Sequence, residues 1–194
     1  MTQAVLLRFA VRLLTLSLLG IVAQRSALAG KDSVPDWVRT AAQQTLPTYP
    51  ATTNAVVLLD ETTLTVSPDG RAVEHHRRAV KILRQAGRDE ADVVVQFDKE
   101  SKILSLHIWS IGPDGHEYAM KDNEILEHGY DGAGGLYDDA RYKVALAPGR
   151  DPGGVVAYES DQRLPGYVSE YDWQYQENIP TIAESSVALS LQSP

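Results

Sequence analysis

Residues 54–84 read NAVVLLDETTLTVSPDGRAVEHHRRAVKILR, and this stretch decides the fold. Its first part, residues 54–66, is rich in β-branched residues and alternates with a period of two, which predicts a strand. Ser67-Pro68-Asp69-Gly70 then supplies turn residues, and Gly70 can adopt a positive φ. Residues 71–84 follow as a second arm, so the stretch predicts a β-hairpin. The first half of that arm is polar, and we expect much of it to face water or to lie at a sheet edge.

Outward from the hairpin, the pattern of short strands and turns continues along the chain. A second Pro-Asp-Gly turn lies within residues 112–115. Residues 122–128 are expected to form a helical turn or a loop. Further strands are expected over residues 91–98, 102–111, 116–120, 142–146, 154–160, 171–177 and 185–191. This arrangement predicts a mainly β fold, an antiparallel β-sandwich rather than a barrel.

Alternation in the strand expected over residues 102–111 divides its side chains between two faces. One face is expected to carry Leu104, Leu106 and Ile108. The opposite face is expected to carry Ile103, Ser105, His107 and Trp109.

One helix is expected, over residues 34–45, before the first strand. Ser33 can cap it, and Asp36 lies in its first turn, where the helix dipole favours a negative charge. Apolar side chains recur on one face at helical spacing: Val34, Trp37, Val38, Ala41 and Ala42. Leu46-Pro47 is expected to end the helix, because a residue before proline disfavours the helical conformation.

The first 29 residues have the composition of a secretory signal peptide. Arg8 and Arg12 precede an apolar run at residues 13–23, and Ala27-Leu28-Ala29 offers the small residues that signal peptidase reads. The apolar run is shorter than the ~20 residues of a spanning helix, which favours cleavage over a membrane anchor. We therefore expect an exported protein, in the periplasm or outside the cell, that is not held in a membrane after cleavage.

Charge and cysteine content exclude several classes of function. The chain has a formal charge of −8, and removing the three arginines of residues 1–29 takes it to −11. Such a protein repels nucleic acid and anionic lipid, so neither is expected as a partner. The sequence contains no Cys, which excludes disulfides, thiolate nucleophiles and zinc–thiolate sites.

The histidines and the acidic loop do not form a recognisable metal site. His75 and His76 are adjacent in a predicted strand, so they point to opposite faces. His107 and His116 lie on neighbouring predicted strands and can approach each other. The loop at residues 131–139 combines acid and glycine but lacks the spaced oxygen ligands of a calcium site. We expect no metal and no cofactor, since phosphate-binding and nucleophile-elbow motifs are also absent from the sequence.

Aromatic residues alternate along the strand expected near the end of the chain. Tyr171, Trp173 and Tyr175 would share one face of that strand. Packing in the core or against another domain is the favoured interpretation of this row. Stacking on a sugar, or contact with a partner, is the alternative.

The order of these landmarks resembles a known family. LLDETTLTV, PDGR, RRAVKIL, VVVQFD, LSLHIWSIGPDG and YDDARYKVALAPGRDPGGVVAYES follow one another over most of residues 51–194. They are similar to the uncharacterised N-terminal domain that precedes transglutaminase-like domains in exported bacterial proteins. The resemblance implies a β-sandwich domain at residues 51–194. It would follow the expected signal peptide at residues 1–29 and a helix and linker at residues 30–50.

The same resemblance places the catalytic machinery outside this chain. In that family a Cys-His-Asp set lies in the domain that follows, and no position here can carry the nucleophile. We therefore expect no catalytic residue in a non-catalytic extracytoplasmic module, whose partner is a downstream transglutaminase-like domain of a longer parent chain. A free-standing module that binds envelope glycan or peptide is the alternative, and a hydrolase that uses carboxylates or histidine is a third hypothesis.

Asp138, Asp139 and Arg141 are the candidate ligand-binding residues, together with Glu159 on the following strand. A carboxylate can accept hydrogen bonds from arginine and from loop amides, so the group is expected to fix the start of a strand. Glu159 is expected to be a partner of Arg141. Because charged loop residues often carry function, a role in ligand binding stays open.

Overall fold

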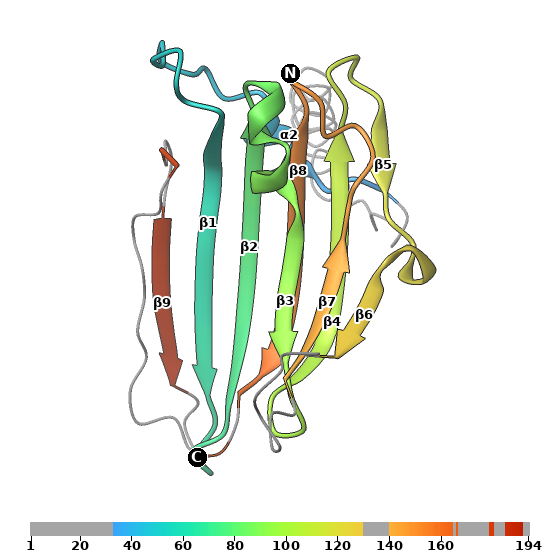
Figure 1. Ribbon diagram of the computed structural model, residues 1–194. Helices are drawn as coiled ribbons and strands as arrows, with labels where there is room; N and C mark the ends of the chain where they lie inside the picture. Colours follow the sequence, from blue (N-terminus) through green and yellow to red (C-terminus); the bar gives the residue numbers. More distant parts are fainter. Residues whose placement is uncertain (1–32, 130–139, 165, 167–178, 181–184, 192–194) are drawn as a thin grey trace, which may run out of the picture. The chain divides into compact units, whose positions relative to one another are not determined.

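The computed structural model describes residues 33–129, 140–164, 166, 179–180 and 185–191. Helix α2 (Asp36–Ala42) precedes the strands, and three short 3-10 turns, η1 (Gln85–Gly87), η2 (Asp89–Ala91) and η3 (Asp122–Glu124), connect them. The strands are β1 (Ala55–Val66), β2 (Ala72–Ile82), β3 (Val93–Phe97), β4 (Lys102–Ile111), β5 (Glu117–Ala119), β6 (Leu126–Gly129), β7 (Arg141–Ala145), β8 (Val155–Arg163) and β9 (Ser185–Leu191) (Figure 1).

The strands form two sheets, which confirms the predicted mainly β fold with one short N-terminal helix. The larger sheet has the order β5-β4-β8-β2-β1-β9, and the smaller one has the order β3-β7-β6. All neighbouring strands run antiparallel except β1 and β9, which pair in parallel with Leu64 opposite Leu189. The predicted strand at residues 171–177, with Tyr171, Trp173 and Tyr175, lies outside the described residues, as does the predicted signal peptide.

Both Pro-Asp-Gly turns close hairpins in the larger sheet, as predicted. Gly70 joins β1 to β2 with φ 80°, and Gly115 joins β4 to β5 with φ 81°. In each turn the glycine N–H donates to the carbonyl three residues earlier, on Ser67 and Gly112, at 2.9 Å. Glycine suits both positions because it has no Cβ to oppose a positive φ.

Helix α2 is shorter than predicted, and Ser33 is not its cap. Pro35 occupies the N-cap position with an extended backbone (ψ 158°), and no side chain caps the helix. The Pro35 carbonyl accepts hydrogen bonds from the backbone N–H groups of Val38 (3.1 Å) and Arg39 (3.3 Å), which begins the helix at Asp36. The described helices are too short to cross a lipid bilayer.

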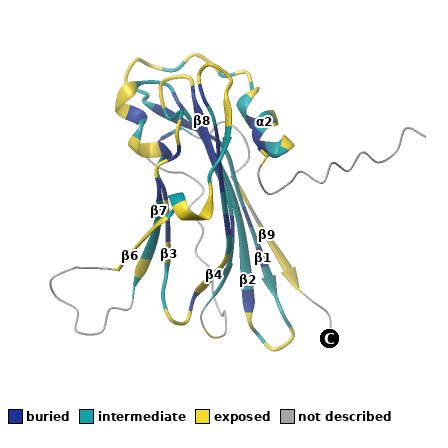
Figure 2. Ribbon diagram, turned by 90° about the vertical axis from the view of Figure 1, so that its right-hand side faces the viewer, coloured by how far each residue is buried: buried dark blue, intermediate teal, exposed yellow. Residues whose placement is uncertain are grey.

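Two apolar clusters lie on opposite faces of the larger sheet. Figure 2 shows helix α2 on one side of this sheet and strands β3 and β7 on the other. On the outer face, helix α2 places Val38 against Leu58 of β1 and Ala157 of β8. On the inner face, the smaller sheet places Val93 and Ala145 with Ile108 and Val156, among others. Burial of both faces accounts for the continuous apolar run of β8, because Val155 and Ala157 belong to the outer cluster and Val156 to the inner one. In β1, Val56 and Leu58 belong to the outer cluster, while Ala55 and Val57 pack in a third cluster with Val80 and Ile179.

A bulge in β4 overturns part of the predicted side-chain alternation. The register with β8 shifts between Ile103 and Ser105. Ile103 consequently packs on the inner cluster together with Leu106 and Ile108, while Leu104 is exposed. One extra residue in a strand reverses the faces of the residues before it, and the period of the sequence does not show where that residue lies.

Candidate functional site

The structure separates the predicted site residues. Arg141 begins β7 in the smaller sheet, and its guanidinium Nη1 lies 3.1 Å from the Oε1 atom of Glu127 in β6. Glu159 lies in β8 of the larger sheet, where its cross-strand neighbours are Arg77 and His107. In the described part of the chain, Arg141 pairs with Glu127, and the expectation that Glu159 would be its partner was wrong. Asp138 and Asp139 lie outside the described residues.

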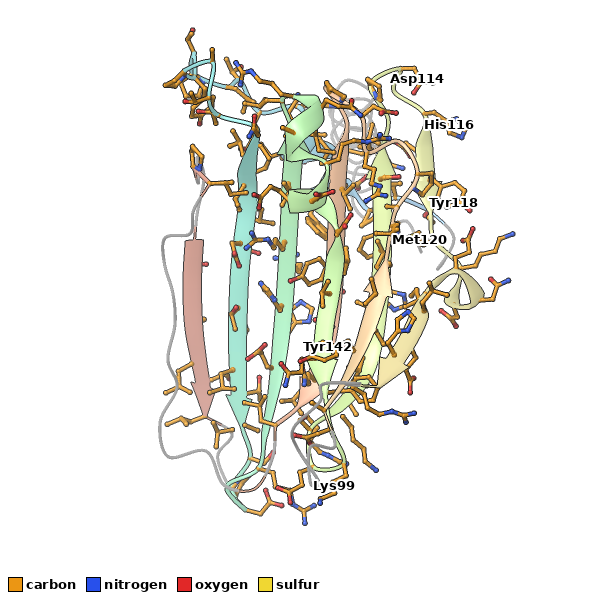
Figure 3. The ribbon with its side chains drawn as sticks, viewed as in Figure 1. Lys99, Asp114, His116, Tyr118, Met120 and Tyr142 are labelled. Carbon is orange, nitrogen blue, oxygen red and sulfur yellow. The ribbon has the colours of Figure 1, made fainter. Side chains whose placement is uncertain are left out.

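Arg141 lines a cavity of about 770 Å³ at one end of the two sheets. We call this cavity the end pocket. Its walls come from the β3–β4 turn, from the first residues of β4, and from β6 and β7. Lys99, labelled in Figure 3, lies in that turn, and Tyr142 is the neighbour of Arg141 in β7. The end pocket brings together charged residues from three segments that are distant in sequence.

Glu159 belongs to a different surface. This surface is a polar area on the outer face of the larger sheet, the face on which helix α2 packs. Cross-strand register gives two rows, which we call the outer polar rows. The first contains Glu61, Arg77, Glu159 and His107, and the second contains Thr63, His75, Asp161 and Ser105. Opposite charges therefore face each other on neighbouring strands, which stabilises a sheet by cross-strand pairing.

Asp161 is the centre of the second outer polar row. Its Oδ1 atom lies 2.8 Å from Nδ1 of His75, and its Oδ2 atom accepts a hydrogen bond from the Ser105 hydroxyl at 2.7 Å. Burial raises the pKa of Asp161, but the hydrogen bonds from Ser105 and His75 and the charges of His75 and His107 outweigh it, so the net direction is downward. The Ser105 hydroxyl thus donates to a carboxylate, whereas a nucleophilic serine donates to a base that a carboxylate orients.

A second polar network lies on the inner face of the same strands. Asp60 accepts from Arg78 at 2.5 Å and lies 2.8 Å from Nε2 of His76, whose Nδ1 lies 3.2 Å from the Tyr158 hydroxyl. The prediction that His75 and His76 point to opposite faces is confirmed, since one bonds Asp161 on the outer face and the other bonds Asp60 on the inner face.

His107 and His116 do not approach each other as the strand order suggested. His107 stands opposite Glu159 in the first outer polar row. His116 precedes β5, where its carbonyl accepts from Gly112 beyond the end of β4. In the parts of the chain that the structure describes, no group of three histidine, aspartate or glutamate side chains is placed to hold a metal ion.

The Asp60 network predicts a loss of stability in acid. Burial raises the pKa of Asp60, but the bond and charge of His76 and the interactions with Arg78 outweigh it and hold the pKa below the ordinary 3.8. A carboxyl with a depressed folded-state pKa stabilises the fold above its unfolded value, and this contribution disappears as pH falls below 3.8 and through the folded pKa. We expect the free energy of unfolding, measured by urea titration, to fall over that window. The fall is expected to be smaller in Asp60→Asn, and an identical pH profile in that variant would contradict the assignment.

The sequence alone did not predict the role of several residues in these sites. Lys143 was not singled out, although it shares the inward face of β7 with Ala145, opposite Val95 of β3. Glu127 was placed in a helical turn or loop, whereas it lies in strand β6. The alternation of side chains along a strand was the signal that could have found them. A charged residue at an inward position of a strand indicates a polar cavity or an ion pair.

Fold and geometry together define a two-sheet β domain whose polar faces are held by cross-strand pairs. The chain belongs to the DUF3857 family, a domain of unknown function with a solved structure, whose family model matches residues 68–193.

Solved structures add evidence on the fold. The chain is similar to part of a putative protease from Parabacteroides distasonis, with a TM-score of 0.50, 15% identity, and coverage of 60% of this chain and 24% of that one. It also matches the CBM3a-L domain from scaffoldin cipA of Clostridium thermocellum, with 12% identity over 71% of this chain and 82% of that domain. The TM-score of that match is 0.36, which is too low to support a conclusion. No curated protein matches the sequence.

Proposed function

We propose that the chain is a non-catalytic, extracytoplasmic β-sandwich module that acts by binding. In this proposal it forms the N-terminal part of a longer exported protein, in which a transglutaminase-like domain follows. The observation that carries the proposal is the pairing within the outer polar rows. Ser105 and His75 are both bonded to Asp161, and Arg77 is bonded to Glu61 at 2.5 Å, so these polar groups stabilise the sheet.

Two further observations support a module rather than a complete enzyme. The sequence has no Cys, so a thiolate nucleophile of the transglutaminase type must be supplied by another segment. In the Parabacteroides distasonis putative protease, the matching region is 24% of the chain, so a comparable fold stands there within a much longer protein. The order of landmarks that resembles the domain ahead of transglutaminase-like domains agrees with this arrangement.

The proposal is tested on the whole parent protein. We expect the gene to continue beyond residue 194 into a segment with a Cys-His-Asp set. We then expect that segment to transfer the acyl group of a glutamine peptide to a fluorescent amine. Ser105→Ala and Asp161→Asn should leave kcat within about twofold of wild type, because neither residue touches reacting atoms. Substitution of the downstream cysteine should abolish transfer.

Two results would overturn the proposal. One is a reading frame that ends at residue 194 or continues without such a segment. The other is a large loss of kcat in Ser105→Ala at unchanged thermal stability, which would place this serine in the chemistry. Measuring unfolding of each variant by circular dichroism separates a catalytic effect from a folding defect.

Peptide binding is the second candidate, and the end pocket favours it. The cavity lies within the range of about 300–1,000 Å³ that is typical of small-molecule sites. Its lining combines charged side chains with the apolar side chains of Phe97 and Ile103, which we call the apolar floor. Glycan binding through the aromatic row has no comparable support, because that row lies outside the described residues.

A further inference from the structure

Among the residues that the structure describes, the lining of the end pocket is more basic than acidic, although the chain as a whole is acidic. Four described basic side chains line it, Lys99, Lys102, Arg141 and Lys143, against two described acidic ones, Asp98 and Glu127. The complete chain has a formal charge of −8. A concave site whose charge is opposite in sign to that of the surrounding surface concentrates ligands that are attracted to the site. For a basic pocket these ligands are anions.

The two described carboxylates of the pocket have partners of their own. Asp98 accepts from the backbone N–H groups of Glu100 (2.7 Å) and Ser101 (2.6 Å) within its own turn. Those two backbone hydrogen bonds, Ser101 first, lower the pKa of Asp98. Glu127 pairs with Arg141 at 3.1 Å. Neither acid reaches Lys102 or Lys143 through an ion pair within 4 Å in the described part of the chain.

Lys143 is placed where a strand ordinarily carries an apolar residue. It stands opposite Val95, which belongs to the inner apolar cluster and is 8% exposed. It occupies an inward position two residues before buried Ala145, and it is only partly exposed. Partial desolvation of an ammonium group costs free energy, so an inward lysine is retained most readily where a carboxylate or another anion can offset that cost.

We propose that the end pocket binds an acidic peptide, whose carboxylates pair with Lys143, Lys102 and Arg141 while its apolar side chains lie on Phe97 and Ile103. The apolar floor distinguishes such a ligand from a bare inorganic anion, which makes no use of it. The inference rests on the proposed binding role of the module. It does not depend on which domain follows, so the two can fail separately.

Binding is measured with the signal-free chain and a fluorescent, acetylated and amidated pentapeptide, Glu-Ala-Glu-Leu-Glu. The control peptide has the same sequence with glutamine in place of each glutamate. We expect the acidic peptide to bind at least about tenfold more tightly than the glutamine peptide in fluorescence polarisation. We expect its affinity to fall as sodium chloride rises from about 0.05 to 0.5 M, because salt screens exposed charge pairs.

Two variants and a matched control locate the site. Lys143→Gln and Lys102→Gln should each weaken binding of the acidic peptide about fivefold to tenfold. Lys81→Gln removes the same charge from β2, outside the pocket, and should leave the affinity unchanged. Thermal unfolding of every variant checks that the fold is intact.

Three results would overturn the inference: equal affinity for the two peptides, no binding at millimolar peptide, or an equal loss in Lys81→Gln. Titration with free glutarate and with inorganic phosphate distinguishes recognition of a peptide from recognition of any small anion. We expect both to compete at least about tenfold more weakly than the peptide. If either displaces the peptide as well as unlabelled peptide does, the pocket is a general anion site and the peptide assignment is wrong.

Discussion

Asp60→Ala is expected to lower the free energy of unfolding by about 3 kcal/mol, because it removes one partner of a buried ion pair. The Asp60 and Arg78 side chains are only 16% and 14% exposed. Asp60 also accepts from His76, so the substitution takes the acceptor from two donors at once. The measurement is urea unfolding at pH 7, followed by circular dichroism.

Glu61→Ala is the matched control for this effect. Glu61 is the next residue in β1 and pairs with Arg77 on the outer face, where the two side chains are 26% and 33% exposed. Pairs with access to water contribute about 0–1 kcal/mol, so a much smaller loss is expected. An equal loss of unfolding free energy in the two variants would show that burial does not determine how much the Asp60 network contributes to stability.

Gly87→Ala is the second substitution with a large expected effect, also about 3 kcal/mol, at the upper end of the cost of overpacking. A Cβ at Gly87 would lie 2.2 Å from the carbonyl oxygen of Asn54. That oxygen accepts from the backbone N–H groups of Leu83 (2.8 Å) and Arg84 (3.0 Å). Because the clash is with backbone, relief requires moving η1 away from Asn54, the residue before β1.

Gly129→Ala is the control, since nothing lies within 4 Å of a Cβ added there. Surface substitutions of this kind usually change stability by less than about 0.5 kcal/mol. Both variants are compared with the wild type by the urea concentration at the midpoint of unfolding, provided that the slope of the transition is unchanged. A Gly87→Ala protein as stable as Gly129→Ala would mean that the η1 segment moves aside freely, contrary to the packing described here.

Local signals in the sequence predicted most strands and both hairpin turns. Gly70 and Gly115 mark turns that their neighbours close by local hydrogen bonds, so the sequence carries the information directly. The β4 bulge was not predictable, because Ile103 and Leu104 are both apolar and alternation alone cannot locate an inserted residue. The parallel pairing of β9 was also missed, since it depends on a partner far away in sequence.

The candidate site was less predictable than the fold. Arg141 was recognised as a charged residue at the start of a strand, but its partner was assigned along the chain, to Glu159. The actual partner, Glu127, lies in the neighbouring strand of the smaller sheet. The end pocket itself arises where the β3–β4 turn meets β6 and β7, and only the three-dimensional arrangement places Lys102 near Lys143.

The parallel pairing of β1 with β9 has a consequence for the order of events during biosynthesis. Of the strands that the structure describes, β1 is the first to leave the ribosome, and β9, which covers its open edge, is the last. Pairing between such distant segments is slow because the intervening chain must first be ordered. Until β9 has been synthesised, β1 keeps a line of unpaired amides that other chains can use. A truncation at residue 68, where the family match begins, would remove β1 and leave β9 without its hydrogen-bonding neighbour.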